Sequence, residues 1–193
     1  MPQLIRIIYI SRSTFQATRT DAVIEPNVGR ILAQSRINNR RDGLVGVLYF
    51  GDGCFFQCLE GEQSAIDALY ARLQKDKRHK DLKLLAREPI RALSYEEWAM
   101  KFVPLEREMT RMLKAAGLQR FDPYRFDKPM VQKVMDLLRT ASDPTTGAIV
   151  EDLLRKSIAT PTSGKKDPVA FWPFAAAGLT AAAAAAAAVF LLR

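Results

Sequence analysis

The sequence is poor in the residue types from which metal sites and hydrolytic sites are usually built. Its 193 residues include one histidine, His79, and two cysteines, Cys54 and Cys58. A single histidine excludes metal sites made of several histidines and disfavours Ser-His-Asp catalysis. If the two cysteines share one extended strand, their Cα atoms are about 13 Å apart, which is too far for a disulfide. We therefore expect two reduced, packed thiols, as is usual in cytosolic proteins.

The sequence also lacks a concentrated block of charge of one sign. The formal net charge is +8, and it is divided evenly: residues 1–103 hold 16 basic and 12 acidic side chains, and residues 104–193 hold 13 and 9. Sites for nucleic acid or anionic membranes usually concentrate positive charge on one element. We therefore expect a soluble basic surface and no nucleic-acid partner. We also expect no signal peptide, because Met1 leads almost directly into a strand-like run.

The sequence does contain an alternation of strand-like and helix-like segments. Strands are predicted at 4–10, 44–50, 54–59, 82–86 and 98–103, and helices at 26–39 and 66–73. Gly51-Asp52-Gly53 predicts a hairpin between the second and third strands. The order β-α-β-β-α-β-β predicts an α+β fold, a ferredoxin-like sheet with one strand added and two helices on the same face.

Four segments are predicted along the chain. Residues 1–103 form the domain just described, and residues 104–159 form a helical cap with helices near 105–116, 127–141 and 146–158. Residues 160–168 are a polar linker, and residues 169–193 are an Ala-rich tail. The cap is expected either to complete the fold by covering the open face of the sheet, or to contact an effector or another copy of the chain.

The tail carries no charge over residues 169–192. Its 24 residues are long enough to cross a hydrocarbon core of about 30 Å, and Lys165 and Lys166 precede it. These features favour a membrane anchor that holds the domain at the inner, cytoplasmic face of the membrane. The alternative is a soluble alanine helix that docks on the domain or on another copy, since alanine is the best helix former.

Several polar side chains occupy faces that should be apolar. The inward face of the first helix continues after Leu32 with Ser35, Asn38 and Asn39. Gln57 lies on one strand face between two apolar neighbours, and Tyr9 ends the apolar face of the first strand. Buried amides and hydroxyls are costly unless they are hydrogen-bonded. Either these groups satisfy one another or cap backbone groups, or they surround a bound ring that has donors and acceptors along its edge.

These residues belong to a set of short motifs that resembles the BLUF domain, a blue-light sensor that binds FAD. In order, the motifs are Ile8–Ser11, Ser35–Asn39, Gly43–Tyr49, Phe55–Gly61, Asp76–His79 and Trp98–Phe102. Each motif is weak alone, but the ordered set is highly specific. The resemblance covers residues 3–103. It implies a short, single-domain photoreceptor that has no catalytic output domain and signals to a separate effector protein. It also implies a homo-oligomer.

The resemblance implies that FAD binds without a covalent bond, between the two helices. Ile31 and Leu73 would lie against the two faces of the flavin ring, and Asn38 and Asn39 would hydrogen-bond its pyrimidine edge. The full set of cofactor-binding residues that it implies is Tyr9, Ile31, Ser35, Asn38, Asn39, Gln57, Arg72, Leu73 and Asp76.

The resemblance also implies a photoswitch made of Tyr9, Gln57, Trp98 and Met100. In the family, blue light drives electron and proton transfer from the tyrosine to the flavin, and the glutamine then rearranges or tautomerises. Glutamine suits this role because its rotatable amide carries both a donor and an acceptor. An in/out exchange of Trp98 and Met100 would pass the signal to the last strand. The period of two places both of these residues on one strand face, together with Phe102.

Two other functions are compatible with a ferredoxin-like plan. An acylphosphatase-type enzyme needs an arginine in a phosphate-cradling loop; Arg12 follows the first strand, but the Gly-rich loop is missing. An RNA-binding module needs stacking aromatics on an open sheet, a role for which Tyr49, Phe55 and Phe56 are candidates. The usual sequence pattern of such an RNA-binding module is missing. Because each of the two functions lacks a required feature, both rank below the flavin sensor.

Overall fold

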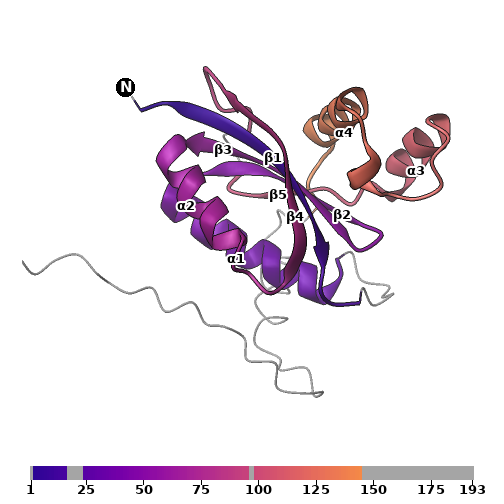
Figure 1. Ribbon diagram of the computed structural model, residues 1–193, viewed down its shortest axis with the longest axis horizontal. Helices are drawn as coiled ribbons and strands as arrows, with labels where there is room; N and C mark the ends of the chain where they lie inside the picture. Colours follow the sequence, from indigo (N-terminus) through magenta and orange to yellow (C-terminus); the bar gives the residue numbers. More distant parts are fainter. Residues whose placement is uncertain (1, 17–23, 96–97, 145–193) are drawn as a thin grey trace, which may run out of the picture. The chain divides into compact units, whose positions relative to one another are not determined.

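The computed structural model describes residues 2–16, 24–95 and 98–144. Five strands form one mixed sheet in the order β4-β1-β3-β2-β5 (Figure 1). The first seven elements are β1 (Leu4–Ser13), α1 (Pro26–Asp42), β2 (Val45–Gly51), β3 (Cys54–Glu62), α2 (Gln63–Leu73), β4 (His79–Pro89) and β5 (Lys101–Phe102). This arrangement confirms the predicted α+β, ferredoxin-like fold with an added strand.

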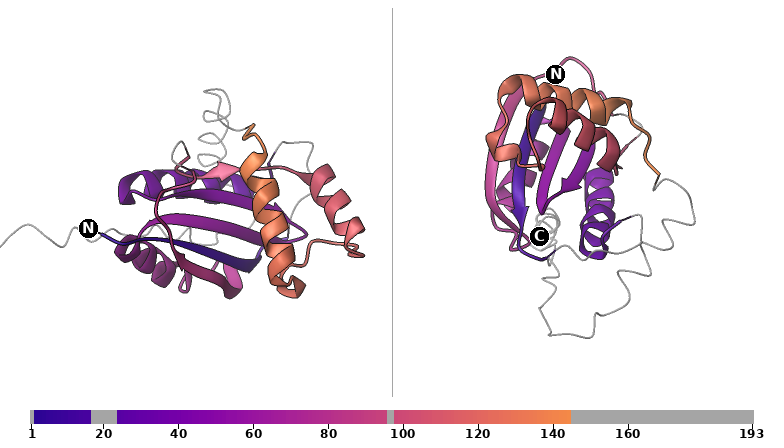
Figure 2. Two further views of the ribbon diagram at one scale, coloured as in Figure 1. Left: turned by 90° about the horizontal axis from the view of Figure 1, so that it is seen from above. Right: turned by 90° about the vertical axis from the view of Figure 1, so that its right-hand side faces the viewer.

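Three further elements follow the sheet: α3 (Glu106–Ala115), the 3-10 helix η1 (Pro123–Arg125) and α4 (Lys128–Thr140). Helices α1 and α2 lie on one face of the sheet, and α3 and α4 lie on the other (Figure 2). Each face therefore has its own apolar core. The predicted helix at 146–158, the linker and the tail lie outside the described residues, and the predicted segment boundaries stay predictions.

The ends of α1 follow from local chemistry. The Glu25 side chain accepts a hydrogen bond from Val28 N at 2.9 Å, and Pro26 occupies the first turn, where its missing N–H is no loss. The helix ends at Gly43, whose φ of 65° is the left-handed conformation that glycine adopts easily. It is one turn longer than predicted, because Arg40 and Arg41 continue it as good helix formers.

The predicted hairpin is confirmed. Gly51 pairs with Cys54 across a two-residue turn in which Asp52 and Gly53 have φ values of 47° and 74°. Positive φ at both positions is typical of a type I′ turn, whose twist matches that of the strands. The turn fixes the register of β3, and both of the chain's cysteines are buried and free on that strand, as predicted.

β1 and β3 each extend three residues beyond their predicted ends, and the last two strands differ more from the sequence prediction. β4 extends over 79–89 instead of 82–86, and its pairing with β1 is irregular between Ile8 and Tyr9 and again between Ile10 and Arg12. β5 contains two residues only, and residues 98–100 lie outside it. The alternation predicted for Trp98–Val103 therefore holds only in its last part.

No helix among the described residues is long and apolar enough to cross a membrane. Residues 169–192, on which the anchor prediction rests, are not among them.

Candidate functional site

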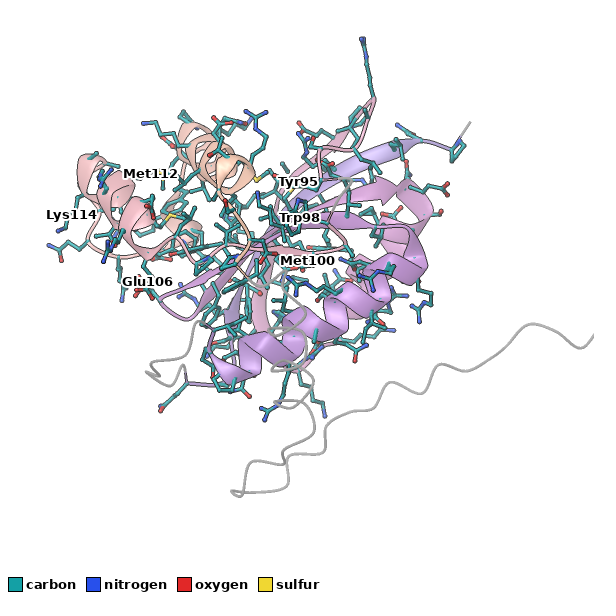
Figure 3. All side chains as sticks on the ribbon, turned by 180° about the vertical axis from the view of Figure 1, so that it is seen from behind. Tyr95, Trp98, Met100, Glu106, Met112 and Lys114 are labelled. Carbon is teal, nitrogen blue, oxygen red and sulfur yellow. The ribbon has the colours of Figure 1, made fainter. Side chains whose placement is uncertain are left out.

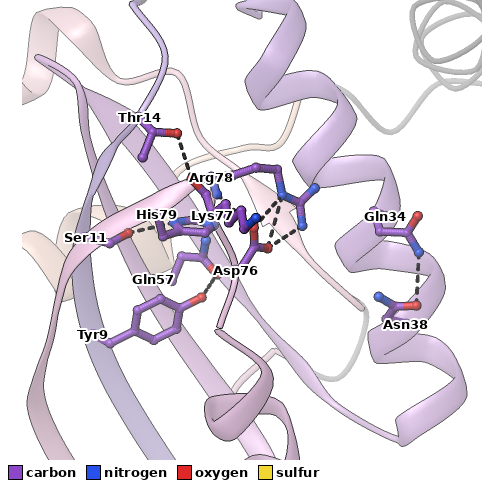
Figure 4. Close-up of polar contacts among 10 residues, drawn as sticks. All are labelled: Tyr9, Ser11, Thr14, Gln34, Asn38, Gln57, Asp76, Lys77, Arg78 and His79. Atoms are coloured by element: carbon purple, nitrogen blue, oxygen red, sulfur yellow. Dashed lines mark hydrogen bonds and ion pairs between the residues drawn. The ribbon is translucent and has the colours of Figure 1, made fainter. Parts of the chain in front are cut away.

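The centre of the site is a hydrogen bond between Tyr9 on β1 and Gln57 on β3. The two residues are directly opposite each other in the antiparallel pair, so their side chains meet on the same face of the sheet. Both are almost completely buried, at 1% and 3% exposure. The Tyr9 hydroxyl donates to Oε1 of Gln57 (Figure 4). Because Oε1 accepts this proton, the Nε2 N–H groups of Gln57 are directed away from Tyr9.

The Tyr9 phenol holds its proton firmly. Burial raises its pKa far above the ordinary value of a tyrosine, and the charge of Asp76 adds to the effect. The ring is fixed by an edge-on contact with Tyr70 of α2, with ring centroids 6.3 Å apart. Tyr9 is therefore a neutral, rigidly held donor in the interior.

Two amide side chains of α1 are buried, as the sequence predicts. Asn38 accepts from Nε2 of Gln34 at 3.1 Å, and Asn39 donates through Nδ2 to the carbonyl of Ala99 at 2.7 Å. With these bonds made, the Asn38 N–H groups and the Asn39 amide oxygen can serve other partners. Ser35, one turn earlier, is half-buried.

The apolar residues predicted to flank a ring come from different helices. Ile31 of α1 is buried, and Leu73 at the end of α2 is half-buried against the same core. Arg72, beside Leu73, joins the two helices through an ion pair with Asp42 at 2.8 Å. The structure thus brings Ile31, Leu73 and Arg72 to the side of the sheet that carries Tyr9 and Gln57.

Asp76 lies in the turn between α2 and β4, where Arg78 holds it. Its carboxylate accepts from the Arg78 guanidinium at 2.5 Å and from the Arg78 backbone N–H at 2.9 Å. Burial alone would raise the pKa of Asp76, but the hydrogen bonds and charge of Arg78 outweigh it and keep that pKa below its ordinary value. Asp76 is therefore ionised and is paired with Arg78.

Sequence reasoning assigned no role to a second polar pair beside Tyr9. Ser11 lies two residues further along the same face of β1, and its Oγ is 2.8 Å from Nδ1 of His79. The His79 ring also packs on Phe55, with centroids 4.7 Å apart. Burial lowers the pKa of His79 to about 4, although Asp76 opposes the shift, so the imidazole is neutral. Ser11 could have been found from the sequence, because the period of two that places Tyr9 on the inward face of β1 also places Ser11 there.

The prediction that Trp98 shares a face with Met100 and Phe102 is wrong. Met100 and Phe102 are buried in the core on the α1 and α2 side, whereas Trp98 packs against the core on the α3 and α4 side (Figure 3). The reason is that residues 99 and 100 form a bend, so the chain turns between the two side chains and strand alternation does not apply. Met100 is therefore the inward residue of the pair.

The residues proposed for the rival functions are engaged elsewhere. Tyr49, Phe55 and Phe56 are buried at 4%, 0% and 0% exposure, because helices cover both faces of the sheet. Arg12 stacks on Tyr124 at 4.4 Å and forms an ion pair with Asp122. The sheet offers no open stacking surface for RNA within the described residues, and Arg12 is bound to protein groups.

The donors and acceptors at the site fit the edge of an isoalloxazine ring. That edge presents two carbonyl acceptors and one N–H donor. Asn38 and Gln57 can each supply N–H groups, and Asn39 can supply a carbonyl oxygen, all from buried positions. Buried amides with one end already satisfied suit a planar ligand of this polarity.

Comparisons with known proteins agree with this chemistry. The family model BLUF, described as sensors of blue-light using FAD, matches residues 4–101. Photoactivated adenylate cyclase subunit alpha of Euglena gracilis is 30% identical over 123 residues, which is 58% of this chain and 12% of that protein. Subunit beta from the same organism is 32% identical over 96 residues, 50% of this chain and 11% of that protein. The chain thus spans a small part of these relatives.

Solved structures show the same similarity. BlsA in its ground state is 29% identical with a TM-score of 0.66, over 78% of this chain and 98% of that one. A bacterial light-regulated adenylyl cyclase is 26% identical with a TM-score of 0.51, over 75% of this chain and 41% of that one.

Proposed function

The chain belongs to the BLUF family, the sensors of blue light that use FAD, and we propose that the Tyr9–Gln57 hydrogen bond is its photoswitch. The observation that carries the proposal is the direction of this bond: the phenol donates, and the glutamine accepts through Oε1. A glutamine held in this way has one definite orientation in the dark, and rotation or tautomerisation would reverse the polarity of its outer end.

Bound FAD would supply absorption of blue light and an acceptor for an electron. Tyr9 would supply the electron and the proton, since its phenol donates to Gln57 and is fully protonated before light. Gln57 relays the change, because it contacts Tyr9 with one end and directs N–H groups toward the other side. The buried surroundings exclude water, which strengthens each hydrogen bond and makes the two orientations distinct.

We assign the binding of FAD to residues on the α1 and α2 side of the sheet. Asn38 and Asn39 would hold the pyrimidine edge, and Ile31 and Leu73 would flank the ring. Ser35, Arg72 and Asp76 are assigned to its outer parts. Support comes from burial of both asparagines and from the Arg72–Asp42 ion pair, which joins α1 to α2.

We infer that the output is carried by another protein. The similarity to the cyclases covers a sensor portion, and the described elements beyond that portion are three helices. We propose in addition that α3 and α4 contact this effector and that two or more copies of the chain assemble. We also propose a cytoplasmic location.

The proposed anchor over residues 169–192 rests on sequence alone. An uncharged stretch of 24 residues would place the sensor at the inner face of a membrane. Fractionation of cells separates this role from that of a soluble helix.

Substitution of Gln57 by leucine tests the proposed switch. Leucine is close to glutamine in volume, so we expect FAD to stay bound, while the reversible red shift of the flavin band after blue light is lost. Gln74→Leu, the same change at an exposed position after α2, is the matched control and should shift as the wild type does. A normal shift in Gln57→Leu would remove Gln57 from the mechanism.

A further inference from the structure

The short strand β5 is bonded to the C-terminal end of α4 through a buried lysine. Lys101 is 5% exposed, and its Nζ donates to the carbonyls of Leu138 and Arg139 at 3.1 and 3.0 Å. The last carbonyls of a helix lack partners within the helix, and a positive charge there is favoured by the helix dipole. Lys101 therefore serves as a cap for α4 that is supplied by a different element.

A second buried charge, that of Asp143, connects β5 and the end of α4 to α1. Oδ2 of Asp143, three residues after α4, accepts from Phe102 N at 2.8 Å and from Arg36 at 3.0 Å. The Asp143 side chain is fully buried, and Arg36 is 11% exposed. Arg36 also donates through Nε to the carbonyl of Met100 at 3.0 Å. The chain just beyond α4 is thus bonded both to β5 and to α1.

These bonds continue up to the proposed flavin edge. Asn39, three residues after Arg36 on α1, donates to the carbonyl of Ala99. Each residue from 99 to 102 is therefore bonded to α1, to the end of α4 or to Asp143. This segment also contains Met100 and adjoins Trp98, whose ring lies 5.9 Å from Nζ of Lys101.

The energetics of these buried bonds favour two discrete states over a continuous range. A buried ammonium or carboxylate that loses its partners carries a large desolvation cost, so small displacements of β5 are resisted. A larger displacement would break both Lys101 bonds together and leave the last turn of α4 without its cap. Packed elements that change in this way can convert a small shift at a ligand into a larger one elsewhere.

We propose that Lys101, Asp143 and Arg36 form a latch that holds the end of α4 on β5 in the dark, and that light at the Tyr9–Gln57 switch opens it. The inference rests on the proposed function, because the switch provides the displacement of residues 98–102. Lys101 and Asp143 are positioning residues here, with no direct role in the photochemistry. The latch gives α4 a route of response that requires no contact with the flavin.

Hydrogen exchange at the last turn of α4, in the FAD-loaded full chain, tests the latch. In the wild type we expect amides of residues 137–143 to exchange about fivefold faster under blue light than in the dark. A change of this size corresponds to the loss of about one hydrogen bond. Lys101→Met keeps the length of the side chain but has no donors. It should show the fast rate in both conditions and keep the red shift of the flavin.

Lys133→Met is the matched control, because Lys133 is exposed on α4 itself. It should retain both the slow dark rate and the light response. If Lys101→Met fails to fold, Asp143→Asn replaces it: the amide oxygen can still accept from Phe102, but the charge that faces Arg36 is gone, and the light-to-dark ratio should fall toward one. The red shift of the wild type reports on the proposed function separately.

Two results would overturn the latch. One is a wild type that shows the red shift but exchanges equally fast at α4 in light and dark. The other is a folded Lys101→Met or Asp143→Asn variant whose light-to-dark ratio equals that of the wild type.

Discussion

At the scale of single residues, the site is organised by buried polar groups whose partners can be named. Tyr9 and Gln57 satisfy each other across two strands, and Asn39 is satisfied by the backbone of Ala99. Tyr9, Gln57 and both asparagines could be selected from the sequence, because a period of two on strands and of 3.6 on helices places them on apolar faces. The partner of each could not be selected, since it depends on strand register and on the path of residues 98–100.

Tyr9→Phe tests whether the phenol is the photochemical donor. Phenylalanine keeps the buried shape but has no hydroxyl, so we expect FAD to bind and the normal red shift to disappear. Flavin fluorescence should rise, because a nearby electron donor that quenches it is removed. Tyr124→Phe, on the opposite side of the sheet, should behave as the wild type. Wild-type fluorescence and photocycle in Tyr9→Phe would reduce Tyr9 to a core residue.

His79 makes the stability of the fold depend on pH. Its pKa in the folded state is lowered from 6.5 to about 4, so the unfolded chain takes up a proton first as pH falls. The resulting stability is present above pH 6.5 and is lost on the way down to pH 4. Between pH 7.5 and 5, the wild type should lose about 1–2 kcal/mol more free energy of unfolding than His79→Gln.

Denaturant unfolding at both pH values measures this difference, since carboxylates shared by the two proteins cancel in the comparison. Equal losses would mean that His79 is accessible to protons in the folded state.

At the scale of elements, close packing of strands positions the segment that follows the switch. A Cβ atom on Gly46 of β2 would lie 2.1 Å from the backbone oxygen of Cys58, and the Gly46 N–H donates to the carbonyl of Trp98. Gly46 therefore permits the close approach of β3, and its N–H also holds residue 98.

The strands and the hairpin could be predicted well from the sequence, because turn chemistry and β-branched runs are local signals. The prediction failed for β5, where tertiary hydrogen bonds determine the path.

Gly46→Ala should lower the free energy of unfolding by about 1–3 kcal/mol, because the strands must separate to admit the methyl group. Gly117→Ala is the control: that site has open space around it, and the cost is limited to its φ of 73°. Thermal unfolding of the two variants gives the comparison. A loss at Gly46 no larger than that at Gly117 would contradict the close approach.

At the scale of the whole molecule, helices cover both faces of the sheet in the part of the chain that the structure describes. The family match ends at residue 101, and the helices that follow cover the opposite face of the sheet from the proposed flavin site. Their existence was predictable from helical periodicity. Their attachment through Lys101 and Asp143 was not, since a lone lysine in a strand pattern and an aspartate before Pro144 carry no local signal of a shared partner.

The tail prediction is tested by comparing the full chain with a truncation after Gly164. We expect the full chain to sediment with membranes and to resist carbonate extraction, because residues 169–192 would be inserted. The truncated chain should be soluble, yellow and photoactive. Recovery of the full chain entirely in the high-speed supernatant without detergent would exclude the anchor and favour the docked helix.

The most direct test of the account is the visible spectrum of the purified wild-type chain before and after blue light. The protein should carry FAD at about one molecule per chain, and illumination should shift the flavin band to longer wavelength, with full return in the dark. This shift reports a changed hydrogen bond at the ring without net reduction of the flavin. Fully FAD-loaded protein whose band bleaches or does not move under blue light would contradict the Tyr9–Gln57 switch.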